Sequence, residues 1–99
     1  MFVVTLRFSH NKAAAGQHMD AHKAWLRQGM QDGVFLLAGS LQPNAGGAIF
    51  AHDTSLAALQ ERVAQDPFVQ HGVVAADILE VTPSLTDPRL DFLKAQVAA

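Results

Sequence analysis

His22 and Asp66 are the two residues of this chain whose types could do chemistry together. His22 lies beside Met19 and Trp25 on the apolar side of a helical pattern, where an imidazole without a hydrogen-bond partner costs about 1 to 3 kcal/mol. Asp66 follows a second helical pattern, at the end where the helix dipole disfavours a carboxylate by about 0.3 to 1 kcal/mol. A hydrogen bond between the two side chains would relieve both costs.

Such a pair is suited to acid–base catalysis. A carboxylate bonded to one imidazole nitrogen sets the tautomer, favours the imidazolium and leaves the other nitrogen to exchange a proton with a substrate. The sequence therefore predicts a cofactor-independent enzyme in which His22 moves a proton on a small anionic molecule while Asp66 orients the imidazole. Proton abstraction beside a carbonyl, followed by isomerisation or loss of a leaving group, is the chemistry this pair can serve. The alternative is a non-catalytic ligand-binding or accessory protein that uses the same cavity.

A metal site is a further interpretation of the same helix. His18 and His22 are four residues apart on one helix face, a spacing that can hold a metal ion. A metal site needs three or four ligands, and the usual glutamate or third histidine is not nearby in the sequence. Asp66 and His71 are the residues that could complete the site. We expect no bound metal, and a metal retained through purification would contradict that expectation.

Six elements must position these residues. Alternating residues predict a strand at 2–8, and apolar residues three or four apart predict a helix at 13–31, with Lys23 on its polar side. A second helix, at 56–66, ends at or just before its last residue, because Pro67 disfavours helical geometry for the residue that precedes it. Further strands are expected at 34–38, 48–51 and 73–81, the first of them buried on both faces.

The order strand, helix, strand, strand, helix, strand predicts an α+β fold of the ferredoxin-like type, with a four-stranded antiparallel sheet and both helices on one face. The strands carry apolar residues for both faces, and an uncovered apolar face normally marks an interface. We therefore expect a homodimer in which two chains stack their sheets. Residues 1–83 are predicted to form this domain. Residues 84–99 are predicted to form a short helix or arm, from a weak helical pattern of Leu90, Phe92, Leu93 and Val97.

This fold gathers polar residues that are far apart in the sequence. The loops at one end of the sheet are expected to bring these residues toward one cavity: Ser9, His10, His18, Ser40, Asp66 and His71, with His22 one turn further inside. His52 falls elsewhere. We predict that His22 and Asp66 are catalytic. The residues predicted to bind the ligand are His18, Trp25, Ser40 and His71.

Composition excludes several classes of function. The 99 residues carry seven Lys and Arg against nine Asp and Glu without a basic block, so no nucleic-acid partner is expected. The absence of cysteine excludes disulfides, thiolate metal sites and cysteine nucleophiles. No apolar run approaches the roughly 20 residues that span a membrane, and the first residues show no secretory signal pattern. We therefore expect a cytoplasmic protein.

Three short motifs resemble one known family. HKAWL at 22–26, LLAGSL at 36–41 and the Asp-Pro-Phe sequence at 66–68, in this order and spacing, are similar to the YCII-like family of dimeric α+β barrel proteins. The resemblance covers roughly residues 1–83, which is nearly the whole chain.

The resemblance also implies roles for particular residues. His22 and Asp66 match the proposed active-site pair of the family, whose members studied as enzymes suggest lyase or isomerase chemistry on small, often chlorinated, ring-cleavage or aromatic compounds. Met19 and Ser40 depart from the arginine and the proline that family members often have at these positions. The resemblance therefore assigns no particular substrate to this chain.

Overall fold

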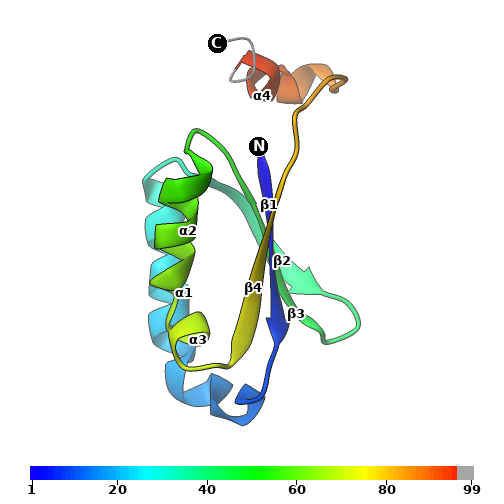
Figure 1. The fold of residues 1–99 in the computed structure, drawn as a ribbon. Helices are drawn as coiled ribbons and strands as arrows, with labels where there is room; N and C mark the ends of the chain where they lie inside the picture. The colour runs from blue at the N-terminus through cyan, green and yellow to red at the C-terminus, as the bar shows by residue number, and fades with distance from the viewer. Residues whose placement is uncertain (96–99) are drawn as a thin grey trace.

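Helices cover one face of a four-stranded sheet in the computed structural model, which describes residues 1–95 (Figure 1). The elements in chain order are β1 (Phe2–Phe8), η1 (Lys12–Ala14), α1 (Ala15–Gln31), β2 (Phe35–Leu41), β3 (Gly46–Ala51), α2 (Leu56–Ala64), α3 (Pro67–Gln70), β4 (Val74–Glu80), η2 (Pro88–Leu90) and α4 (Asp91–Ala95), where η denotes a short 3-10 helix. The strands lie in the order β2-β3-β1-β4, and each neighbouring pair is antiparallel. This is the predicted α+β, ferredoxin-like fold.

The helix-covered face of the sheet holds the hydrophobic core. Phe2, Val4 and Leu6 alternate along β1 and are almost fully buried, because successive side chains of a strand point to opposite faces. Leu59 and Val63, four residues apart on α2, belong to the same core cluster. Burial of each such side chain contributes about 1.5 to 3 kcal/mol, which holds the helices on this face.

The position of β2 differs from the prediction. The sequence predicts a strand buried on both faces at 34–38, whereas β2 runs on to Leu41 and is largely exposed. This prediction was wrong because β2 is an edge strand, and Leu37 keeps 50% of its surface exposed on the face that no helix covers. A short apolar run alone does not distinguish a central strand from an edge strand whose open face is also apolar.

A short helix that the sequence analysis does not predict, α3, follows α2 directly. Pro67 occupies its first turn, where a residue without an N–H is favoured, and the N–H of Gln70 donates to the carbonyl of Asp66 at 2.9 Å. The Nδ2 atom of Asn11 donates to the carbonyl of His71 at 2.7 Å, which ties the end of α3 to the loop between β1 and α1. Four residues are too few for helical periodicity to appear in the sequence.

No helix of residues 1–95 covers the opposite face of the sheet, which carries a row of apolar side chains. The strand register places Leu37 of β2 opposite Phe50 of β3, Phe50 opposite Val3 of β1, and Val3 opposite Leu79 of β4. Leu37, Phe50 and Leu79 are exposed, and Val3 is half-buried between its neighbours. We call these four residues the apolar row.

The C-terminal segment lies at the end of the sheet near the N-terminus, far from α3 (Figure 1). Leu93 of α4 is buried, and the ring of Phe92 meets the ring of His52 edge-on with centroids 5.6 Å apart. Val97, which the predicted tail pattern includes, lies outside the described residues. The predicted division of the chain at residue 83 stays a prediction.

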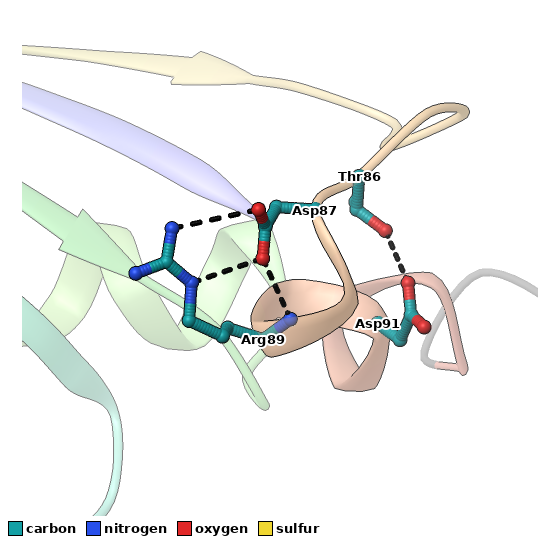
Figure 2. Close-up of polar contacts among 4 residues, drawn as sticks. All are labelled: Thr86, Asp87, Arg89 and Asp91. Atoms are coloured by element: carbon teal, nitrogen blue, oxygen red, sulfur yellow. Dashed lines mark hydrogen bonds and ion pairs between the residues drawn. The ribbon is translucent and has the colours of Figure 1, made fainter.

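Polar contacts shape the turn that leads into α4, as Figure 2 shows. Asp87 accepts hydrogen bonds from the backbone N–H of Arg89 at 2.9 Å and from its guanidinium at 3.0 and 3.4 Å, while the Thr86 hydroxyl donates to Asp91 at 2.6 Å. The guanidinium of Arg89, followed by its backbone N–H, lowers the pKa of Asp87. Because these side chains are largely in water, the contacts set the shape of the turn and add little stability.

Candidate functional site

A cavity of about 300 Å³ lies between α1 and the helix-covered face of the sheet. This volume is at the lower end of the range for small-molecule sites, about 300 to 1,000 Å³. Most of its wall is apolar and includes Leu6, Phe8, Met19, Leu26, Ile49 and Phe68. Ser40 of β2 and Gly47 of β3 pair on this face, and their small size leaves the space beside the strands open.

His22 and Asp66 are hydrogen-bonded at this cavity, across 44 positions of sequence. The Nδ1 atom of His22 lies 2.7 Å from Oδ1 of Asp66. When the carboxylate is ionised it can only accept, so Nδ1 of His22 is then the donor of this hydrogen bond. The sequence predicts that these two side chains are hydrogen-bonded directly or through one water, and the contact in the structure is direct, with a length typical of a charge-assisted bond.

The position of Asp66 at the start of α3 explains how its carboxylate is held. The backbone of Asp66 is extended, and Oδ1 also accepts the N–H of Phe68 at 3.0 Å, so Asp66 is the N-cap of α3. The sequence analysis places Asp66 only at the negative end of the preceding helix. That account is incomplete, because α2 ends at Ala64 and the N-terminus of α3 favours a negative charge at this point.

The imidazole of His22 lies against two other aromatic rings. Phe68 stacks on it with centroids 4.0 Å apart and planes 5° apart, and Trp25 lies 5.9 Å away on the same helix. The indole N–H of Trp25 donates to the carbonyl of Arg62 at 3.0 Å, which anchors that ring between α1 and α2. His22 lines the cavity and keeps 12% of its side chain exposed, and its Nε2 has no hydrogen-bond partner in residues 1–95. Nδ1 of His22 is thus held by Asp66, and Nε2 is available to a ligand in the cavity.

The second carboxylate oxygen of Asp66 is buried without a hydrogen-bond partner among the described residues. Asp66 itself has no exposed surface and does not line the cavity. Its negative charge is therefore compensated mainly at Oδ1, by His22 and the N–H of Phe68. A buried carboxylate with so few donors makes the contact with His22 energetically important, because leaving a buried charge unpaired costs several kcal/mol.

The remaining predicted histidines form a separate group beside the cavity. His18 of α1 stacks on His71 after α3 with centroids 3.9 Å apart and planes 5° apart. Neither lines the cavity, and the ring of His10 lies against Gly72, with its Nδ1 atom 3.4 Å from the hydroxyl of Ser9. The polar residues predicted to gather at one end of the sheet therefore lie in the same region, but of these only His22 and Ser40 line the cavity.

The stacked histidines do not form a metal centre within the part of the chain that is described. The ring nitrogens of two parallel rings point in parallel planes and do not converge on one ion. Throughout residues 1–95, no three histidine, aspartate or glutamate side chains are grouped so that they could hold a metal.

Ser40 and Trp25 differ in their relation to the cavity. Ser40 lines it from β2, opposite α1. Trp25 does not; its ring packs edge-on against Phe35 at 5.1 Å and borders the imidazole of His22. Ser40 is thus placed to touch a ligand, whereas Trp25 supports His22.

Lys23 and Phe68 are cavity residues to which sequence reasoning assigned no function. Lys23 is on the polar side of α1 by periodicity, yet it lines the cavity, because the cavity extends to the solvent-exposed edge of the helix. Its position next to His22 is the one local signal that could have identified it. Phe68 lies within the Asp-Pro-Phe sequence, but its stacking on His22 depends on the unpredicted α3.

The fold and the cavity define a small α+β domain with an imidazole–carboxylate pair, and comparison with known proteins assigns it to a family. Residues 1–82 match the YCII-related domain, so the chain belongs to the YCII-related domain family. This confirms the resemblance found in the sequence. No curated protein matches the chain.

A solved structure with the same fold is 5-chloro-2-hydroxyhydroquinone dehydrochlorinase (TftG) from Burkholderia phenoliruptrix AC1100, in complex with 2,5-dihydroxybenzoquinone. The TM-score is 0.67, the sequences are 16% identical, and the match covers 85% of this chain and 96% of that chain. Between residues 1 and 95, no helix is long and apolar enough to cross a membrane.

Proposed function

We propose that this protein is a cytoplasmic, cofactor-independent acid–base enzyme of the lyase or isomerase type, acting on a small anionic or aromatic-derived molecule. The observation that carries the proposal is the 2.7 Å hydrogen bond between Nδ1 of His22 and the buried carboxylate of Asp66, with the other edge of the imidazole at a ligand-sized cavity. The catalytic roles of His22 and Asp66 and the ligand contact of Ser40 are parts of this proposal, and His18, Trp25 and His71, which do not line the cavity, are proposed only as residues near it.

The proposed chemistry begins at Nε2 of His22. With its proton on Nδ1, a neutral imidazole carries a lone pair on Nε2 and accepts a proton from an acidic C–H or O–H of the ligand. The electron pair left on the ligand forms a new double bond. In an elimination the leaving group departs with its bonding electrons, and in an isomerisation the proton returns at another carbon. Asp66 stabilises the imidazolium that forms, and the stacked Phe68 holds the ring in place.

The nature of the cavity supports a compact, largely apolar substrate. Phe8, Met19 and Leu26 supply an apolar wall, and the volume of about 300 Å³ suits a molecule of one ring. TftG is named for the loss of hydrogen chloride from a chlorinated hydroxyhydroquinone and was solved with a dihydroxybenzoquinone. We therefore propose hydroxylated, halogen-bearing ring compounds as the first substrates to test.

The test compares His22→Ala with the native protein, using 5-chloro-2-hydroxyhydroquinone as the probe and chloride release as the readout. Loss of the base is expected to lower turnover by about 10²- to 10⁴-fold while binding largely survives. His52→Ala is the matched control, because His52 lies at the other end of the sheet beside Phe92 and should leave turnover unchanged. Equal turnover in native protein and His22→Ala would remove His22 from the mechanism.

A non-catalytic ligand-binding protein is the second candidate. It is favoured by the fact that Asp66 already has a structural task as the N-cap of α3, so the hydrogen bond to His22 does not by itself require catalysis. This candidate predicts that ring compounds bind in the cavity without any turnover, and that His22→Ala changes only their affinity.

We also propose that two chains pair through the uncovered face of the sheet. The apolar row of Val3, Leu37, Phe50 and Leu79 supports this proposal, because it crosses all four strands on a face that no helix covers. A twofold dimer buries the same surface of both chains, which suits a row that can face a copy of itself.

A further inference from the structure

The charge around the cavity is one-sided. Among the described residues that line it, Lys23 and His22 are the only ones with side chains that can carry a charge, and because His22 is neutral when it accepts a proton, Lys23 supplies the positive charge of the wall in that state. Within residues 1–95, no aspartate or glutamate lines the cavity, and Asp66, the partner of His22, is fully buried. A cavity with low-dielectric walls and a single sign of charge attracts ligands of the opposite charge.

Lys23 keeps its charge available for a ligand. Its ammonium group makes no ion pair or hydrogen bond with another residue of the part of the chain that is described, whereas Arg62 lies 3.0 Å from Asp32 and Lys94 lies 3.6 Å from Asp91. Asp20, one turn earlier on α1, does not pair with Lys23 either. The ammonium group is therefore not neutralised by a carboxylate of this domain.

Lys23 and His22 can act on different parts of one molecule. They are neighbours on α1, so their side chains leave the helix about 100° apart, yet both reach the same cavity. His22 is held in place by Asp66 and Phe68, while Lys23 is exposed and has a flexible stem. The rigid group is suited to proton transfer, and the flexible cation is suited to holding an anionic oxygen at the rim.

We propose that Lys23 binds the anionic oxygen of the substrate, a phenolate, enolate or carboxylate, and so directs the apolar body of the molecule into the cavity over His22. Lys23 is then a specificity-determining residue, which selects small organic anions over neutral molecules of the same shape. This inference rests on the proposed function for its cavity, but it concerns binding and not turnover.

The experiment measures equilibrium binding by calorimetry, with 2,5-dihydroxybenzoquinone as the acidic probe and hydroquinone as the neutral probe. Lys23→Gln is expected to weaken binding of the anionic probe about tenfold and to leave the neutral probe unchanged. Arg27→Gln is the matched control, because Arg27 is an exposed cation on the same helix that does not line the cavity. Raising the ionic strength should weaken binding of the anion to the native protein more than to Lys23→Gln.

Two results would overturn the inference. One is that Lys23→Gln and Arg27→Gln bind the anionic probe equally well, and the other is that the native protein prefers the neutral probe. Failure of the proposed catalytic role is distinguishable, because it appears as unchanged turnover in His22→Ala while the effect of Lys23→Gln on binding remains. Lys23 is exposed, so its replacement should leave thermal unfolding unchanged, and this confirms that the variant is folded.

Discussion

Replacement of Asp66 by alanine tests the reasoning about the site most directly, because one oxygen serves two partners. Oδ1 accepts from Nδ1 of His22 at 2.7 Å and from the N–H of Phe68 at 3.0 Å. Asp66→Ala therefore removes a charge-assisted hydrogen bond and the N-cap of α3 in a single step. The two losses can be separated by measuring each against a matched variant.

The expected magnitude follows from these two contacts. Loss of an N-cap costs about 1 kcal/mol, and loss of a hydrogen bond that involves a charged group costs about 1.5 to 3 kcal/mol. Asp66→Ala should therefore lower the free energy of unfolding by about 2.5 to 4 kcal/mol, which at about 4 to 8 °C per kcal/mol for a domain of this size is a fall in Tm of about 10 to 30 °C. Ser55→Ala measures the cap alone, because the Ser55 hydroxyl accepts the N–H of Ala58 at 3.1 Å as the N-cap of α2 and has no second side-chain hydrogen bond within residues 1–95.

A double-mutant cycle isolates the contact between the two side chains. Urea unfolding of the native protein, His22→Ala, Asp66→Ala and the double variant gives the coupling free energy, which should be about 1.5 to 3 kcal/mol. His22→Ala alone should be at least as destabilising as Asp66→Ala, because it leaves a buried carboxylate with one remaining donor. A coupling below about 0.5 kcal/mol would refute the claim that the pair is a strong, buried interaction.

Two further predictions concern the surface of the domain. Leu79→Asp places a charge in the apolar row and should convert a dimer to a monomer in light-scattering measurements. Leu85→Asp is the control and should leave the dimer intact, because Leu85 is 92% exposed and lies outside the row. A native protein that is already monomeric would contradict the proposed interface. Hydrogen bonds from Gln28 and then Arg62 lower the pKa of Asp32. The stability that Asp32 contributes is therefore present above the pKa of the unfolded chain and is lost as the pH falls through the lower pKa of the folded protein. Urea unfolding should show Asp32→Asn less stable than native protein at neutral pH, with the difference disappearing in acid, and a difference that persists in acid would refute this cause.

The regular elements were predictable because their patterns are local. The alternation of Phe2, Val4 and Leu6 requires one buried face of a strand, and β1 has the predicted bounds. The long helix α1 and the order of six elements led to the ferredoxin-like sheet, since few topologies satisfy the handedness of the crossovers. The hydrogen bond between His22 and Asp66 was also predictable, because a buried imidazole needs a partner and the fold brings Asp66, itself disfavoured by the dipole of the preceding helix, toward the same cavity.

Other features depend on contacts between segments that are distant in sequence. Only the tertiary structure decided these features. Whether an apolar run becomes an edge strand, as β2 does, depends on which strands pair and which face the helices cover. Lys23 reaches the cavity because small residues of β2 and β3 leave space opposite α1, which no periodicity along the helix can indicate. Asp66 and its neighbours form α3 with help from Asn11, which lies 60 positions away from the carbonyl it binds. The physical reason is the separation in sequence of the residues involved. Backbone geometry sets a period that can be detected over a few neighbouring residues, whereas packing and hydrogen bonding join residues that are close in space, however far apart they are along the chain.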